Sequence, residues 1–152
     1  MGESIAVLII FFIIVVIGFV FYMNVLNASS EIEKEENLQL KAIEIAQMAS
    51  FLPELQCSQD NVRRENCIDL LKLEAAEGLI RKNNIYHMYY NDIFESSNIS
   101  IEQKFPTNKR WILYENIPEN YTNKISTFIP ISIFDEKNEQ YNFAILSVKV
   151  YK

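Results

Sequence analysis

Positive charge is scarce in this chain, and the first 26 residues contain no lysine or arginine. The 152 residues carry 14 basic and 20 acidic side chains, which gives a formal net charge of −6. The chain therefore has no basic stripe to neutralise nucleic-acid phosphates, and no basic patch to dock on anionic lipid headgroups. We expect no nucleic-acid partner, and we interpret the acidic balance as a source of solubility.

Histidine and cysteine are also sparse: the chain has one histidine, two cysteines and no Cys-x-x-Cys pair. A zinc site would need acidic residues to complete four ligands, and the acidic run at 135–139 (DEKNE) lacks the alternating ligands and central glycine of a calcium loop. No nucleophile or orienting partner lies at a readable spacing from His87, which we expect to be a partly exposed strand residue. We predict no enzyme activity, no metal and no cofactor.

One long hydrophobic run stands out against this polar background. From Ile5 to Tyr22 the chain has 18 consecutive residues without a charge or a strongly polar group. At about 1.5 Å per residue, a helix of this length spans roughly 27 Å, close to the hydrocarbon thickness of a bilayer. A single segment in lipid must satisfy its own backbone hydrogen bonds, so it must be helical. We predict that residues 1–26 form one transmembrane segment.

Three roles are open to this segment: a cleaved signal peptide, a plain membrane anchor, or a helix used in assembly. A cleaved signal has a positively charged start and an apolar core of about 7–15 residues. Here the chain begins Met-Gly-Glu-Ser and the apolar core is longer. A signal peptide therefore fits poorly, although NAS at 27–29 is similar to a cleavage site.

The first helix is expected to continue beyond the membrane. In residues 31–55 apolar residues recur every three or four positions, which is typical of a helix with one buried stripe. Pro53 is expected to stop this helix, so that it ends at about Leu52. The amphipathic half needs a partner surface outside the membrane. Its stripe consists of Leu38, Ala42, Ile45, Ala49 and Leu52, widened by Ile43 and Ala46.

The rest of the chain predicts a second, short helix followed by a sheet. Asn66 is the expected N-cap of that helix, whose apolar stripe has helical spacing. After Asn84 the pattern changes to the alternation of strands. We therefore predict an α+β domain spanning 27–152, in which an antiparallel meander sheet of four to five strands packs on the helices. The predicted strands are 85–94, 98–105, 110–116, 124–134 and 140–151.

Cys57 and Cys67 lie ten residues apart in a segment that we expect to be a polar loop. They could form a disulfide, belong to a metal site, or remain free thiols. Because a predicted membrane span precedes them, we favour a disulfide in an oxidising compartment. Closing so short a loop would contribute roughly 2–3 kcal/mol on the chain-entropy model, and it would fix the two helices relative to each other.

The organisation of the first 52 residues resembles the type IV pilin-like superfamily, which includes archaeal pilins and the pseudopilins of Tad-type pili. The start GESIAVLIIFF is similar to the processed junction of these proteins: a glycine, a short polar pair and then the apolar run. The resemblance implies that a prepilin peptidase cuts after Gly2 and leaves Glu3 as the mature amino terminus. Many relatives carry a glutamate at the fifth mature position, where this chain has Val7.

The resemblance implies assembly as the function. In this family the apolar helices pack together in a filament core and the head domain faces outward. Glu3 would pair with a neighbour's terminal amine, because an acid entering an apolar bundle needs a counter-charge; the alternative is that Glu3 sits at the water interface. Gly18 would help to shape the packing surface. The expected partners are the lipid bilayer and other pilin-like subunits, including copies of this chain.

We expect a single-pass membrane protein whose C-terminal domain is extracytoplasmic, at the cell surface or in a pilus. Because no basic residue precedes the span, the distribution of positive charge does not set its orientation. The orientation rests on the two cysteines and on three glycosylation-type sequons, at Asn27, Asn98 and Asn120. The alternative function is a membrane-anchored binding or sensor domain that does not polymerise.

Overall fold

The computed structural model describes residues 2–59 and 62–152, which form nine helices and strands. The chain divides into two compact units, Met1–Asn37 and Leu38–Lys152, and the division falls within the first helix. The second unit, here called the head, holds the sheet and every residue that is buried in the described part of the chain. It begins inside the predicted 27–152 domain.

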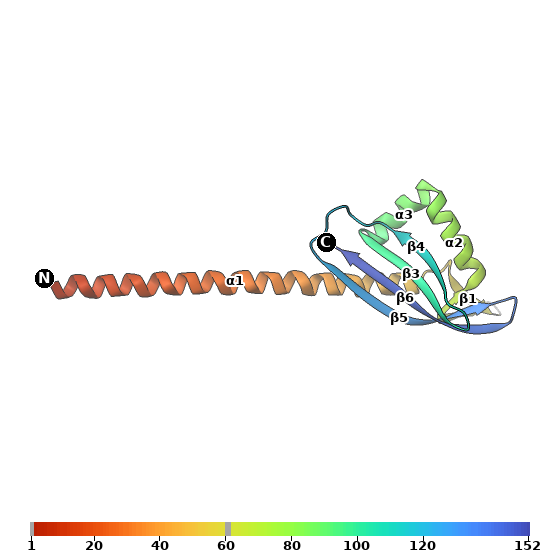
Figure 1. Ribbon diagram of the computed structural model, residues 1–152, viewed down its shortest axis with the longest axis horizontal. Helices are drawn as coiled ribbons and strands as arrows, with labels where there is room; N and C mark the ends of the chain where they lie inside the picture. Colours follow the sequence, from red (N-terminus) through yellow and green to blue (C-terminus); the bar gives the residue numbers. More distant parts are fainter. Residues whose placement is uncertain (1, 60–61) are drawn as a thin grey trace. The chain divides into compact units, whose positions relative to one another are not determined.

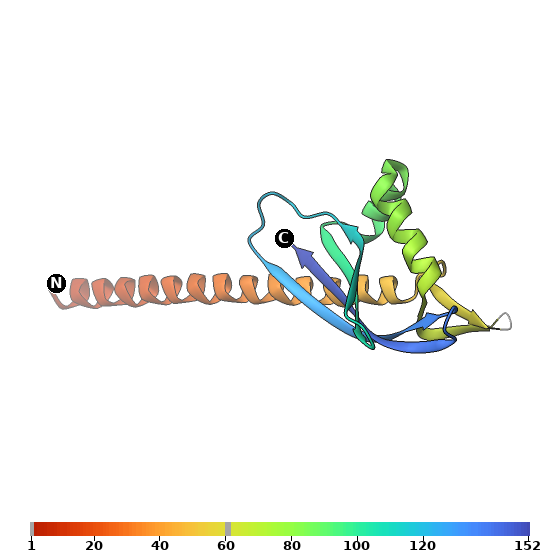
Figure 2. The same ribbon diagram turned by 45° about the vertical axis from the view of Figure 1, so that its right-hand side comes forward.

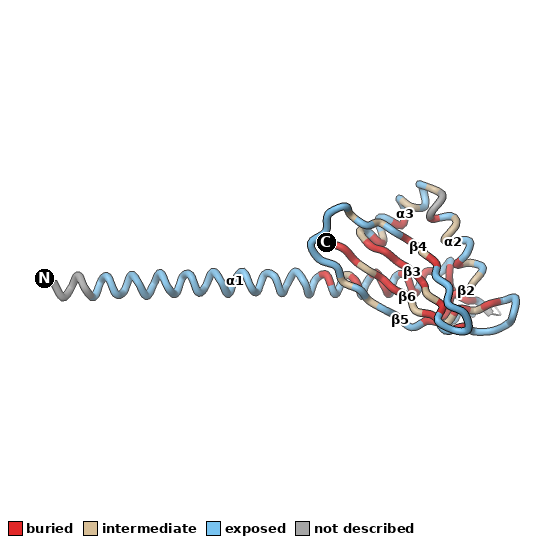
Figure 3. Tube along the Cα trace, viewed as in Figure 1, coloured by how far each residue is buried: buried red, intermediate tan, exposed pale blue. Residues whose placement is uncertain are grey.

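Helix α1 (Gly2–Ser50) is one uninterrupted helix of 49 residues. In its last turn the Ser50 hydroxyl donates a hydrogen bond to the Gln47 carbonyl oxygen over 2.9 Å. The helix ends at Ser50, two residues before the predicted limit. In Figure 3 burial begins only in the C-terminal part of α1. The predicted stripe is buried at Leu38, Ala42, Ile45, Ala46 and Ala49, and Ser50 is buried as well, whereas Ile43 is exposed.

The sheet is mixed and curled, with six strands in the order β1-β2-β5-β6-β3-β4 (Figure 1). The predicted antiparallel meander of four to five strands is therefore wrong. Two hairpins, β3–β4 and β5–β6, are joined because β3 also pairs with β6, and β2 pairs in parallel with the end of β5. The strands are β1 (Gln56–Gln59), β2 (Val62–Asp69), β3 (Ser97–Phe105), β4 (Lys109–Glu115), β5 (Lys124–Asp135) and β6 (Gln140–Tyr151).

Alternating side chains of the central strands build the core of the head. On β6, four alternate residues are fully or almost fully buried, as their period of two predicts: Ala144, Leu146, Val148 and Val150. They belong to one cluster with the stripe of α1 and the inward residues of β3 and β5. The core therefore lies between the inner face of the sheet and the helices.

Two short helices, α2 (Leu70–Lys82) and α3 (Asn84–Phe94), follow one another beside β4 (Figure 2). The second short helix was predicted, but its N-cap is Asp69, because Asn66 lies in β2 with a φ of 54°. The predicted strand at 85–94 is wrong, since this segment is α3. The Asn83 side chain caps α3 by accepting a hydrogen bond from the Ile85 amide, and Tyr90 and Phe94 face the core one turn apart.

Candidate functional site

The largest feature without a partner in the described structure is the apolar surface of α1 between Val7 and Leu26. Every large side chain in this stretch is exposed, from 44% at Met23 to 70% at Phe21. Soluble proteins rarely leave so continuous an apolar surface in water. By length and composition, α1 is long and apolar enough to cross a membrane, and none of its most apolar window is buried.

Three residues of this helix were predicted to act in processing or assembly. The backbone of Gly2 and Glu3 belongs to α1, but their side-chain environments lie outside the described part of the structure. Gly18 lies within the exposed apolar stretch. A Cβ atom added at Gly18 would meet no other atom of the chain within 4 Å, so this glycine is not required by any contact of the chain with itself.

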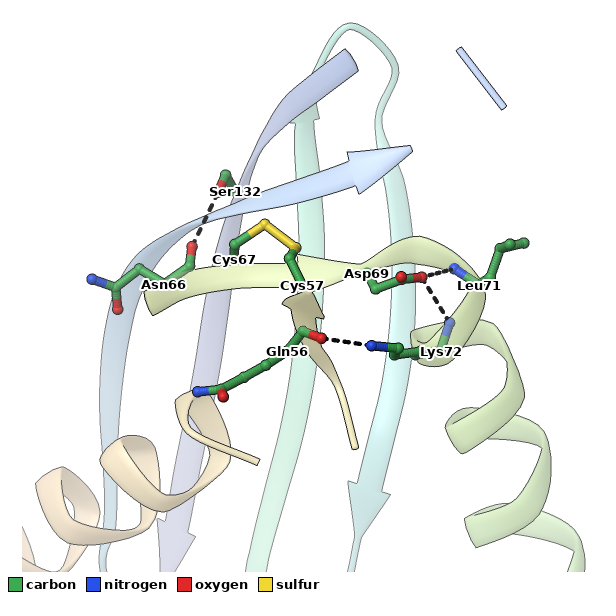
Figure 4. Close-up of a disulfide and its surroundings, with 8 residues drawn as sticks. All are labelled: Gln56, Cys57, Asn66, Cys67, Asp69, Leu71, Lys72 and Ser132. Atoms are coloured by element: carbon green, nitrogen blue, oxygen red, sulfur yellow. Dashed lines mark hydrogen bonds between the residues drawn. A yellow bond between two sulfur atoms is a disulfide. The ribbon is translucent and has the colours of Figure 1, made fainter. Parts of the chain in front are cut away.

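The second feature is the pair Cys57 and Cys67, whose sulfur atoms lie at bonding distance, 1.97 Å apart, with the Cα atoms 5.4 Å apart (Figure 4). This geometry fits the predicted pairing. The expected polar loop is wrong, because the two cysteines lie on the paired strands β1 and β2 and are almost fully buried. The sequence around the cysteines is polar and lacks the alternation of apolar and polar residues that predicts a strand, so these two strands were not predicted.

The bridged strands connect the end of α1 with the start of α2. The Asp69 carboxylate accepts hydrogen bonds from the amides of Leu71 and Lys72, 2.9 and 3.1 Å long, and thereby caps α2. The Lys72 ammonium donates to the Gln56 carbonyl oxygen on β1 over 2.8 Å (Figure 4). The cysteine pair thus sits in a hydrogen-bonded joint of the head, a structural role that needs no thiol chemistry.

The only histidine has a structural setting on α3 and is not in a strand. Its ring stacks on Tyr114 with centroids 5.1 Å apart, and Nε2 lies 3.3 Å from the Glu115 carbonyl oxygen. The Tyr114 hydroxyl donates toward Asn91 and the Glu95 carbonyl, both 3.0 Å away. Burial raises the pKa of Tyr114 above its ordinary value, so it remains a neutral donor in this network.

A partly buried tyrosine–glutamate contact was not predicted from the sequence. Tyr90 on α3 donates a hydrogen bond to the Glu54 carboxylate, just after α1 ends. Burial raises the pKa of Tyr90, and the bonded Glu54 raises it further. No sequence motif connects Glu54 with Tyr90, which lies 36 positions further along the chain. Only a predicted helix at 85–94 with Tyr90 on its inner face would have indicated this contact.

Within residues 2–59 and 62–152, no group of three His, Cys, Asp or Glu side chains is placed to hold a metal ion. Comparison with known proteins adds no assignment, since no family model, no curated protein and no solved structure matches this chain. The function of its surfaces is therefore inferred from their chemistry.

Proposed function

We propose that this chain is a membrane-anchored, pilin-like structural subunit that assembles through its apolar N-terminal helix and displays the head outside the membrane. Its role is structural rather than catalytic. The observation that carries this proposal is the contrast along α1. The stretch from Val7 to Leu26 exposes all its large apolar side chains, whereas Leu38–Ser50 carries the stripe that completes the head's core.

The exposed stretch needs an apolar environment, and two environments are available. Lipid covers any apolar helix of sufficient length, because lipid solvation requires hydrophobicity and no particular shape. Neighbouring helices require a matching shape, because helices in lipid associate by close van der Waals contact. The mixture of isoleucine, valine and phenylalanine around Gly18 gives an uneven surface that suits the second environment as well as the first.

The placement of the head outside the cytoplasm is supported by the cysteine pair. Disulfides persist in oxidising compartments and are rare in reducing ones. In this proposal the buried pair Cys57–Cys67 forms during export and stabilises the joint between α1 and α2.

The experiment separates anchoring from assembly by changing the shape of the helix. A leucine-rich span of equal length in place of Ile5–Tyr22 should keep membrane insertion and abolish oligomers or filaments. Gly18→Leu should do the same through one side chain, because a Cβ atom at this position meets no other atom of the chain within 4 Å. Val16→Leu is the matched control, and Glu3→Gln should weaken assembly less than Gly18→Leu.

The readouts are membrane fractionation for insertion, and cross-linking with electron microscopy of the cell surface for assembly. If the wild-type chain is strictly monomeric in its native membrane, the pilin-like proposal fails. The alternative is then an anchored binding or sensor domain. It is favoured by one observation: the core of the head is complete within Leu38–Lys152 and requires no neighbouring copy.

A further inference from the structure

The three sequons of this chain lie in three different structural settings. A sequon is the tripeptide Asn-x-Ser/Thr, whose asparagine can accept an N-linked sugar when x is not proline. The three acceptors are Asn27, Asn98 and Asn120, and the middle residues are alanine, isoleucine and tyrosine. An N-linked sugar is bulky and hydrophilic, so its acceptor side chain must face solvent. The setting of each sequon therefore decides whether the folded protein can carry a sugar there.

Asn98 lies on β3, a strand with neighbours on both sides. It pairs with Glu115 on β4 and with Lys149 on β6, and it is only 6% exposed. Its amide nitrogen, the atom that would carry the sugar, donates a 3.0 Å hydrogen bond to the Glu115 carboxylate. A sugar on this atom would remove that bond and would have to fit at a buried position in the middle of the sheet. A chain that received a sugar at Asn98 could therefore not form this head.

Asn27 lies within helix α1, directly after the exposed apolar stretch Val7–Leu26. Its side chain is exposed, but in the proposed anchor this position lies where the helix leaves the lipid. A sugar transferase must bind the backbone around its acceptor in its own site, and the backbone hydrogen bonds of a helix oppose this. Asn27 therefore differs from the surface-loop setting that is typical of an acceptor.

Asn120 has that setting, in the loop 116–123 between β4 and β5. Asn120 is exposed, as are its neighbours Glu119 and Tyr121. Among the described residues, its side chain makes no hydrogen bond, and no hydrogen bond joins the backbone of residues 117–121 to the rest of the head. The start of the loop is fixed, because the Asn116 amide donates to the Ser97 carbonyl oxygen over 2.8 Å. The acceptor nitrogen thus lies on an open segment of a loop that is anchored to the head.

The third residue of this sequon is bound to the end of the chain's last strand. The Thr122 hydroxyl donates a 2.9 Å hydrogen bond to the carbonyl oxygen of Lys152, 30 residues further along the chain. The Asn123 amide donates to the same oxygen over 2.9 Å. Because a sequon requires this hydroxyl, the transferase must act before Lys152 binds it. We therefore expect the sugar to be added before β6 completes the sheet.

We propose that Asn120 carries an N-linked sugar in the native protein, and that Asn27 and Asn98 do not. This inference rests on the proposed function, which places the head outside the cytoplasm. In the transfer, the Asn120 Nδ2 nitrogen forms a bond to the anomeric carbon of a lipid-linked sugar donor. The bond between that carbon and the donor's phosphate oxygen breaks, and the lipid phosphate leaves with the electron pair. Nδ2 loses one proton to a base of the transferase.

The test uses the full chain purified from its native membranes, and it measures the intact mass and the fragment masses of tryptic peptides. Three tryptic peptides separate the sequons: 1–34, 83–104 and 111–124. Asn120→Gln removes the acceptor. Thr122→Ala removes the hydroxyl of the sequon and leaves Asn120 in place, and Thr122→Ser is its matched control because it keeps a hydroxyl. Both substituted positions are exposed, so these variants should retain the fold.

We expect the wild-type chain to carry the added mass of a sugar on peptide 111–124 alone. Thr122→Ser should keep this added mass, whereas Asn120→Gln and Thr122→Ala should lose it. An unmodified Asn120 in the wild-type chain would overturn the inference. A sugar at Asn27 or Asn98, or an added mass that persists in Thr122→Ala, would overturn it as well.

The thiol state of Cys57 and Cys67 in the same sample distinguishes a failure of this inference from a failure of the proposed function. An oxidised pair together with an unmodified Asn120 would overturn the sugar site and leave the exported placement of the head intact. Free thiols together with an unmodified Asn120 would overturn both.

Discussion

Two stretches of α1 differ both in sequence character and in environment. Val7–Leu26 is apolar on all sides and its large side chains are exposed, whereas Leu38–Ser50 is apolar on one stripe, and that stripe is buried. Three of the six buried residues in Leu38–Ser50 are alanines, at 42, 46 and 49. Burial therefore depends on a matching surface and not on hydrophobicity alone.

The comparison also separates two sources of helix stability. Isoleucine and valine are poor helix formers in water, and the first stretch is rich in both. In lipid the cost of unpaired backbone groups enforces the helix. The second stretch contains better helix formers and is held by its contacts with the core. Changes in the second stretch should therefore alter the stability of the head, and changes in the first should not.

The largest expected effect comes from truncating the same residue type in the two environments. Ile45 is 2% exposed and Ile32, on the same helix, is 66% exposed. Ile45→Ala should lower the free energy of unfolding of the head by about 3 kcal/mol, through lost burial and a cavity. Ile32→Ala should change it by less than about 0.5 kcal/mol. Urea unfolding followed by tryptophan fluorescence measures both, and equal losses would contradict the division at Asn37.

Removing the cysteine pair should affect only the head. Cys57→Ser with Cys67→Ser should lower the free energy of unfolding by about 2–3 kcal/mol, because the unfolded chain regains the freedom of a short loop. Membrane insertion of α1 should be unchanged. Alkylation before and after reduction gives the thiol state directly. Two free thiols in protein purified from native membranes would exclude both the disulfide and the exported location.

A smaller loss is expected at the N-cap of α2. Asp69→Ala removes the acceptor of two amide hydrogen bonds and should cost about 1 kcal/mol, whereas Asp69→Asn keeps an acceptor and should cost less. The measurement is the same urea titration. An Asn variant as unstable as the Ala variant would show that the cap does not act through these hydrogen bonds.

The smallest effect is a pH dependence at the β5–β6 turn. The Asn138 side chain donates to the Asp135 carboxylate over 2.7 Å and lowers the pKa of Asp135, and the Lys137 amide adds to this effect. A lowered folded-state pKa stabilises the head above the ordinary aspartate pKa, and this contribution is lost as pH falls through the lowered value. Asp135→Asn should therefore destabilise the head slightly near pH 7, and this difference should shrink as the pH falls through the lowered pKa. A difference that does not change with pH would contradict this.

The sequence predicted those parts of the fold that have a clear period. The stripe of α1, the strands of the two C-terminal hairpins and the inner face of β6 follow from spacing alone. The helix α3 was missed because tyrosines and isoleucines favour strands in isolation, and its contacts with β4 and the core outweigh that preference. The strands β1 and β2 were missed because they are short or polar, and because β2 pairs with distant residues of β5.

The candidate sites, too, could be predicted only where they appear as a local pattern in the sequence. The apolar span and the cysteine pair were visible as local patterns, so they could be predicted. The unpaired side of β5 between Lys124 and Ile131 could not, because it depends on which strands lie beside β5. Pro130 favours an edge or a bulge in that strand, but it does not indicate that pairing with β2 begins only at Ser132.

The most direct measurement of the central claim is the structure of the head without the span. The account predicts that residues 31–152, produced in an oxidising compartment, form a soluble monomer with dispersed amide signals in NMR, because the stripe of α1 packs on the sheet of its own chain. It also predicts slow exchange for amides of β6, the central strand. A fragment that is disordered or aggregated would contradict the account and would place the partner of that stripe in another chain.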